Sequence, residues 1–195
     1  GMKRPVYDRA LEGLADSGRV LLPASSVVQI DRMLGLAAEL KLNAVLYGGH
    51  EAYRAAEALK QSGVPVLVSL KWPTRDKDAD PEDQEPARVL EMRERAASTP
   101  AVLEKAGVPF AFYSDGVENP KDLMGAVRRA IAAGLSWEGA FRALTLAPAR
   151  IYGVADRLGT IEPGKIANLV VTKGELFQES TEVKYVFIDG VKYEP

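Results

Sequence analysis

The feature that most constrains the fold is a regular alternation between short apolar segments and longer amphipathic ones. Runs of this kind, each followed by a polar turn and then a helical pattern, indicate strands that are buried on both faces. Strands that alternate with helices are typical of βαβ units. The sequence therefore predicts an α/β fold with four parallel strands. The predicted strands occupy residues 19–22, 44–47, 64–70 and 109–113.

The segments between these strands carry apolar residues at the 3.6-residue spacing of a helix. Ser25 and Ser26 are good N-caps for the helix that follows the first strand. Residues 71–86 are polar and contain proline, so we expect a loop there, and loops of this length tend to be functional or disordered. The predicted helices cover residues 6–15, 27–40, 51–61, 87–106 (which can break before Pro100), 121–133 and 136–144, with one more turn at 149–152.

The pattern changes after Gly153, where short strands and turn residues replace the alternation of strands and helices. Strands are expected at 159–161, 167–171 and 183–188, with a hairpin turn at Asp189-Gly190. We therefore predict two units: residues 1–152 form the α/β part, and residues 153–195 form a small β module.

Composition excludes several classes of function. The net charge is −2 with both signs interspersed, which leaves no basic surface for nucleic acid. No apolar run approaches the roughly 20 residues of a membrane span, and no signal segment opens the chain, so cytoplasmic localisation is only a default. The absence of cysteine excludes disulfides, thiolate metal sites and cysteine nucleophiles. His50 is the only histidine, although zinc and iron hydrolase sites usually contain two or more.

Several segments resemble the amidohydrolase superfamily, in particular its imidazolonepropionase-like members. Residues 158–171, LGTIEPGKIANLVV, resemble the closing motif of that superfamily, and VFIDG at 186–190 resembles its last strand. Three upstream segments are also similar to the superfamily, and the first is ALTLAPA at 143–149. YSDG at 113–116 resembles the end of the eighth barrel strand, and GGHEAY at 48–53 resembles the sixth barrel strand.

This resemblance implies a fold and an activity. The expected fold is half of a TIM-like (β/α)₈ barrel, made of the last four βα units, followed by part of a composite β-sandwich built from both chain ends. The expected activity is hydrolysis of carbon–nitrogen, non-peptide bonds in a small molecule with a divalent metal, zinc or similar. Active sites of such barrels lie at the carboxyl ends of the strands.

The resemblance also shows what this chain lacks. A whole barrel has about 250 residues, and the His-x-His pair of the family's first strand does not occur here. Pro23 occupies the position of the metal histidine that ends the fifth strand, and a proline nitrogen cannot bind metal. On the sixth strand, Gly48 aligns with the ligand position and His50 follows two residues later. Asn168 replaces the usual aspartate of the closing motif.

Asp115, His50, Lys71 and Trp72 are the candidate site residues. The resemblance implies that Asp115 is a metal ligand and the catalytic base, and the alternative is an aspartate that stabilises the following turn. His50 is a candidate ligand or pocket residue, or else a histidine at a helix N-terminus. Lys71 and Trp72 begin the loop that would overhang an active site, where they would contact substrate, unless this loop is a solvated connector.

Two functions remain open at this stage. The chain is either part of a hydrolase whose site is completed by an N-terminal half, or a degenerate, non-catalytic domain kept for structure or association. Pro23 favours the second, because truncation alone would not remove a ligand from the half that is present. The isolated chain is expected to be inactive. Since exposed strand edges associate readily, we expect either self-association or pairing with the remainder of a longer parent chain.

Overall fold

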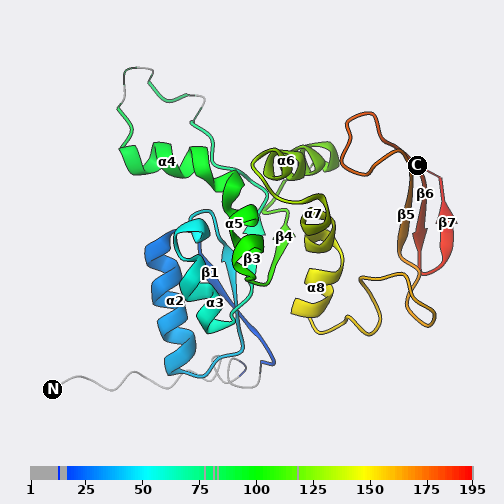
Figure 1. Cartoon of the computed structure of the whole chain (residues 1–195), viewed down its shortest axis with the longest axis horizontal. Helices are drawn as coiled ribbons and strands as arrows, with labels where there is room; N and C mark the ends of the chain where they lie inside the picture. The colour runs from blue at the N-terminus through cyan, green and yellow to red at the C-terminus, as the bar shows by residue number, and fades with distance from the viewer. Residues whose placement is uncertain are drawn as a thin grey trace.

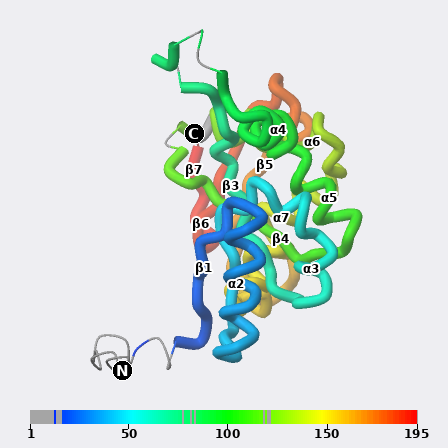
Figure 2. Tube along the Cα trace, turned by 90° about the vertical axis from the view of Figure 1, so that its left-hand side faces the viewer, coloured from blue at the N-terminus to red at the C-terminus, as the bar shows by residue number. Residues whose placement is uncertain are grey.

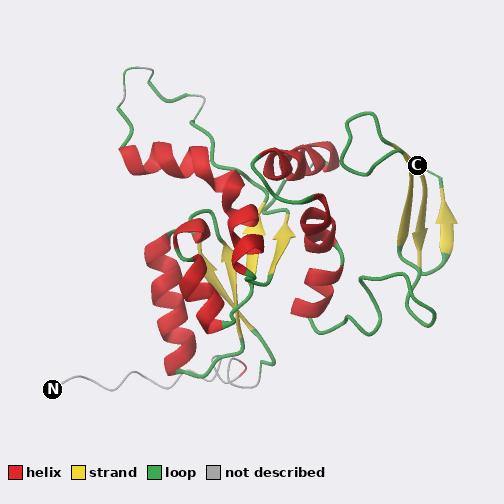
Figure 3. Cartoon of the chain, viewed as in Figure 1, coloured by secondary structure: helices red, strands yellow, loops and turns green. Residues whose placement is uncertain are grey.

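The computed structural model describes residue 13 and residues 17–194, apart from 77, 81, 83 and 118. The helix expected at residues 6–15 lies outside the described residues, except for Gly13. The strands and helices of the described part are shown in Figures 1 and 3.

A four-stranded parallel sheet forms the centre of the molecule, as the alternating pattern predicts. Its strands lie in the order β1-β2-β3-β4, so each strand pairs with the next one along the chain. All three pairings are parallel. The arrows in Figure 1 point toward the end of the molecule that carries helix α4, and Figure 2 shows α4 at that end from the side. Their bounds are Val20–Ala24 for β1, Ala44–Gly48 for β2, Val66–Ser69 for β3 and Phe110–Tyr113 for β4.

The helices agree with the predicted segments, with three differences in detail. The segment 51–61 begins with a 3₁₀ turn at Ala52–Arg54 before its α-helix. The segment 87–106 is divided by a 3₁₀ turn at Ala96–Ser98, and the last predicted turn is a longer helix. The helices are α2 (Val27–Glu39), α3 (Ala56–Ser62), α4 (Ala87–Arg95), α5 (Thr99–Ala106), α6 (Pro120–Ala132), α7 (Trp137–Leu144) and α8 (Leu146–Ile151).

Local chemistry explains where these helices begin. Ser26 caps α2 with its hydroxyl, which accepts a hydrogen bond from the backbone N–H of Gln29 at 3.3 Å. The Gln29 side chain accepts one in return from the Ser26 N–H at 3.0 Å, so the pair forms a capping box. Ser136 caps α7 with its hydroxyl alone, which accepts a hydrogen bond from the Gly139 N–H at 2.8 Å. Pro100 lies in the first turn of α5, where its missing N–H costs nothing.

The two faces of the sheet are covered differently. One face contributes Leu46, Val68 and Phe112 to the main core, which also contains residues of α2, α3, α5, α6 and α7. On the other face, Val45, Leu67 and Ala111 pack against Ile151 of α8. This second face is open near β1, where Leu21 is 49% exposed and Tyr47 is 36% exposed.

The C-terminal part is a separate antiparallel sheet of β5 (Leu169–Lys173), β6 (Glu182–Ile188) and β7 (Val191–Tyr193). Asp189 and Gly190 both have positive φ, at 50° and 81°, as a two-residue hairpin of the expected type requires. The strand expected at 159–161 is absent from the structure. Gly159 instead makes a turn at φ +94°, so close to α8 that a Cβ would lie 2.9 Å from the Leu146 Cα.

This sheet has little core of its own. Figure 3 shows it beside the helical layer rather than stacked on the parallel sheet. Phe177 anchors the segment between β5 and β6, because it is buried against Trp137 of α7 with ring centroids 5.6 Å apart. Among the described helices, none has both the length and the apolarity to cross a membrane.

The junction between β2 and the next helix depends on a buried carboxylate. Glu51 is 1% exposed, and it accepts hydrogen bonds from the Val27 N–H at 2.8 Å and from Arg88 Nη2, also at 2.8 Å. The hydrogen bond from Arg88 is the main cause that lowers the pKa of Glu51, and burial opposes it. Glu51 therefore satisfies a free N–H in the first turn of α2 and ties α4 to the sheet.

Gly48 has no room for a side chain, which yields a stability prediction. Its φ is +109°, and a Cβ would overlap the Ser25 hydroxyl and lie 3.2 Å from the Ser25 backbone. We expect Gly48→Ala to lower the free energy of unfolding by about 3 kcal/mol or more, because backbone strain and overlap add.

Gly63 provides the matched control. It also has a positive φ, +67°, but a Cβ there would meet no atom within 4 Å. Gly63→Ala should cost only about 1–2 kcal/mol, from backbone strain alone. Urea denaturation of both variants measures the difference, and equal losses would show that the close approach of Gly48 to Ser25 does not matter.

Candidate functional site

The carboxyl ends of β2, β3 and β4 bring a small group of polar side chains together. His50 follows β2 by two residues, Ser69 is the last residue of β3, and Asp115 follows β4 by two residues. Because these strands are parallel and adjacent, the three positions lie near one another at the carboxyl end of the sheet.

Asp115 is held by its neighbour on β3. The Ser69 hydroxyl donates to Asp115 Oδ2 at 2.8 Å and accepts a hydrogen bond from the Lys71 N–H at 3.0 Å. Since Ser69 is fully buried, its orientation is fixed by these two partners. Asp115 has a left-handed backbone, φ 51°, which aspartate tolerates better than most residues.

Tyr113 completes the surroundings of Asp115. Burial, then the Asp115 charge and a hydrogen bond to Asp115, together raise the pKa of the Tyr113 hydroxyl to about 12. The phenol therefore stays protonated at neutral pH and can donate to the carboxylate. Its ring packs edge-on against Tyr47, with centroids 6.3 Å apart.

His50 is positioned by the loop after β3. Its Nε2 lies 3.1 Å from the Lys71 carbonyl oxygen. A carbonyl can only accept, so Nε2 carries the proton and Nδ1 of the neutral ring keeps its lone pair. Burial is the largest influence and lowers the pKa of His50, while the bond to Lys71 and the charge of Asp115 act in the opposite direction. The imidazole is therefore neutral at pH 7.

The other candidate residues lie in different surroundings. Pro23 is an exposed residue of β1 and pairs with Tyr47 in the register. The Lys71 side chain is exposed, and only its backbone groups contact Ser69 and His50. Trp72 is 8% exposed, and its indole N–H donates to the Ala126 carbonyl on α6 at 3.0 Å.

These residues do not make a complete metal site by themselves. Within the described part of the chain, no three histidine or carboxylate side chains lie close enough together to hold a metal ion. His50 and Asp115 supply two donor groups, whereas zinc sites take three or four protein ligands. A metal bound here would need further ligands from outside this set.

Ser69 and Tyr113 were not identified as site residues from the sequence. Tyr113 ends the predicted strand 109–113, and Ser69 is the next-to-last residue of the predicted strand 64–70. A polar group at the end of an apolar run is the available signal. What the sequence could not provide is the register, which pairs Ser69 with Tyr113 on the neighbouring strand.

Comparison with known families agrees with this architecture. The Amidohydrolase family matches residues 30–192, which is most of the chain. The chain belongs to the amidohydrolase family. The general activity of this family is hydrolysis, and its members are generally metal-dependent.

Several solved structures share the fold of this chain over less than half of their own length. An amidohydrolase from Thermotoga maritima MSB8 is 31% identical with a TM-score of 0.77, and the alignment covers 91% of this chain but 44% of that one. A Xaa-Pro dipeptidase with bound methionine is 18% identical (TM-score 0.71, 95% and 47% covered). An ochratoxinase from A. niger is also 18% identical (TM-score 0.68, 94% and 43% covered).

The chain thus spans less than half the length of these solved structures. The last two similarities, at 18% identity, concern the fold alone. No curated protein matches the sequence at a significant level.

The single histidine of the sequence allows a direct test of the electrostatics of this candidate site. We expect NMR titration of the His50 ring to give a pKa below the usual value of about 6.5. Asp115→Asn should lower the pKa of His50 further, because the carboxylate charge that favours the imidazolium is removed. An unchanged or raised value in this variant would contradict the proposed proximity of the two groups.

The lowered pKa of His50 also makes the stability of the protein depend on pH. The pKa of His50 is lower in the folded protein than in the unfolded chain, so protonation favours unfolding. The free energy of unfolding should therefore fall as the pH drops below about 6.5, and His50→Gln should remove this part of the pH dependence.

Proposed function

We propose that this chain is the C-terminal half of an amidohydrolase barrel and contributes Asp115 and His50 to a metal-dependent hydrolase site that an N-terminal half completes. The observation that carries the proposal is the coverage of the Thermotoga amidohydrolase, 91% of this chain against 44% of that one. The four parallel strands and their helices would then be the last four βα units of a (β/α)₈ barrel.

The exposed apolar surface supports an incomplete structure. The outer edge of β1, on the side away from β2, pairs with no other described strand. Leu21 on the open face of the sheet is 49% exposed. In the C-terminal sheet, Val170, Ile188 and Val191 are each more than half exposed. In the proposal, residues 1–152 form half of the barrel and residues 153–195 form a segment of the sandwich. The covering partner is the remainder of a longer parent chain, or a second copy of this one.

The proposed roles follow from the geometry at the strand ends. Asp115 is a carboxylate oriented by Ser69, which suits a metal ligand or a proton acceptor. His50 offers the free lone pair of Nδ1 at neutral pH. A bound metal would supply an activated water, but the described residues do not complete its coordination, so no catalytic step is assigned to this chain alone. Lys71 and Trp72 remain candidate substrate contacts.

We further propose carbon–nitrogen, non-peptide bonds of small molecules as the substrate class. The Thermotoga relative is an amidohydrolase. The Xaa-Pro dipeptidase, whose name indicates a peptide substrate, makes dipeptides the first comparison in an assay.

A second candidate function is a non-catalytic domain kept for structure or association. Pro23 at an expected ligand position favours this alternative, and so does the lack of space at Gly48 for any side chain. Both positions lie in the half of the barrel that is present, so an added N-terminal half would not restore them.

Metal binding separates the two candidates. The chain is co-expressed with the half of the Thermotoga amidohydrolase that the alignment does not cover, exposed to zinc, manganese or iron, desalted and analysed for metal. The hydrolase proposal predicts near-stoichiometric metal in the complex, lost in Asp115→Ala and His50→Ala, and little metal in the chain alone. Hydrolysis of N-acyl amino acids and Xaa-Pro dipeptides is then assayed.

Asp122→Ala is the matched control, because Asp122 is an exposed aspartate in the first turn of α6. This variant should keep the metal. A complex that assembles but holds no metal, or that keeps it in Asp115→Ala, would favour the non-catalytic alternative.

A further inference from the structure

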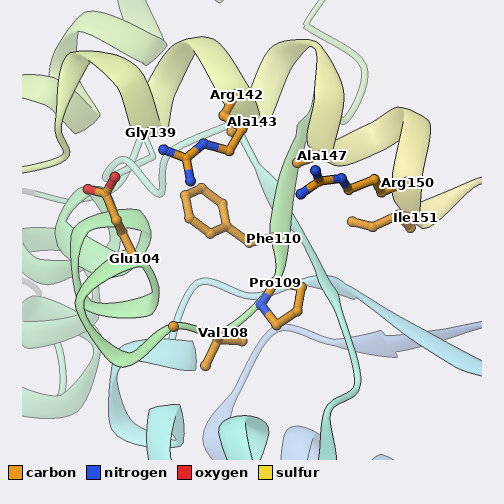
Figure 4. Close-up of a pocket in the computed structure, with 11 residues that line it drawn as sticks. Glu104, Val108, Pro109, Phe110, Gly139, Arg142, Ala143, Ala147, Arg150 and Ile151 are labelled. Carbon is orange, nitrogen blue, oxygen red and sulfur yellow. The ribbon is translucent and has the colours of Figure 1, made fainter. Parts of the chain in front are cut away.

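A second polar feature lies at the opposite end of the sheet, where β4 begins. There a hollow of about 300 Å³ opens between the end of α5 and helices α7 and α8. Figure 4 shows Pro109, which precedes β4, and Phe110, its first residue, on one side of the hollow, and Arg142 and Arg150 of the helices on the other. Asp115 follows the far end of the same strand, so the hollow is separate from the site described above.

The two arginines are the unusual element of this hollow. Both line it and both are exposed. Neither guanidinium forms a hydrogen bond or an ion pair with a described residue. Figure 4 shows both side chains extending from the helices on the side that faces β4. Two positive charges are thus placed at one cavity without an acceptor from the described part of the protein.

The rest of the lining is largely apolar. Phe110 and Ile151 are 8% and 7% exposed, and Ala143 is 1% exposed, so the floor of the hollow is part of the packed interior. A ligand that enters would place apolar atoms against this floor. Its anionic end would face the guanidinium groups, whose planar fork matches a carboxylate.

Glu104 limits which anions fit. Its carboxylate accepts hydrogen bonds from the Ser136 N–H at 3.1 Å and the Ser136 hydroxyl at 2.6 Å, so it is already held at the start of α7. The carboxylate lies beside Gly139 at the wall of the hollow. A second anionic group at that end would be repelled.

We propose that this hollow binds a small monocarboxylate with an apolar body. The volume is at the lower end of the range of about 300–1,000 Å³ found for ligand pockets, so the ligand is about the size of one ring. The proposal does not depend on the hydrolase function, because it uses no residue of the strand-end site.

Benzoate is a suitable probe, titrated into the ¹⁵N-labelled full chain and followed by NMR. We expect saturable shifts at the amides of α7, α8 and the start of β4. Arg142→Gln and Arg150→Gln should each weaken binding about tenfold, which corresponds to the loss of one charge-assisted hydrogen bond. Benzyl alcohol, which keeps the ring without the charge, and phthalate, which adds a second carboxylate, should both bind at least tenfold more weakly.

Arg129→Gln is the control, because Arg129 is an exposed arginine near the end of α6 that does not line the hollow. Its affinity for benzoate should equal that of the wild type. Non-saturable shifts, equal binding of benzyl alcohol, or affinity unchanged in both arginine variants would each overturn the proposal. Since both arginines are exposed, the variants should keep the wild-type circular dichroism spectrum. If one variant unfolds, the benzoate affinity of the other variant tests the proposal.

Discussion

The buried carboxylate of Glu51 is the interaction on which the carboxyl end of the sheet depends. Its side chain binds the first turn of α2 through Val27 and binds α4 through Arg88, while its own N–H donates to the Ser25 carbonyl at 2.9 Å. A buried carboxylate is tolerated only when its acceptor capacity is used. One residue therefore joins the loops after β1 and β2 and the helix that follows the long 71–86 loop.

The glycines before Glu51 make this junction possible. Gly48 and Gly49 have φ of +109° and +66°, and the chain passes so close to Ser25 that no side chain fits at position 48. This sharp turn places the Glu51 side chain against the first turn of α2 and the His50 ring beside the Lys71 carbonyl. The placement of the only histidine is thus a consequence of the same backbone path that buries Glu51.

Local sequence signals predicted most of the elements but few of the contacts at the site. Ser26 and Ser136 cap helices at the expected places, and the four apolar runs form the expected strands, because caps and periodicity are properties of neighbouring residues. The hydrogen bond from Ser69 to Asp115 joins residues 46 positions apart. It depends on strand register, which a single sequence does not encode locally. The absence of a strand at 159–161 also has a cause that lies outside the local sequence. The close contact of Gly159 with α8 determines the backbone conformation there.

The two positions where ligand histidines are expected differ physically. At Pro23 the side chain is exposed on β1, so a different residue can be accommodated without moving the core. At Gly48 a histidine would require a new backbone conformation, and that change would pull Glu51 away from α2 and Arg88. Substitution at position 48 thus cannot rebuild a ligand without cost to the fold. In the proposed hydrolase site, His50 and Asp115 are therefore the two donors that this chain would supply without a change of backbone.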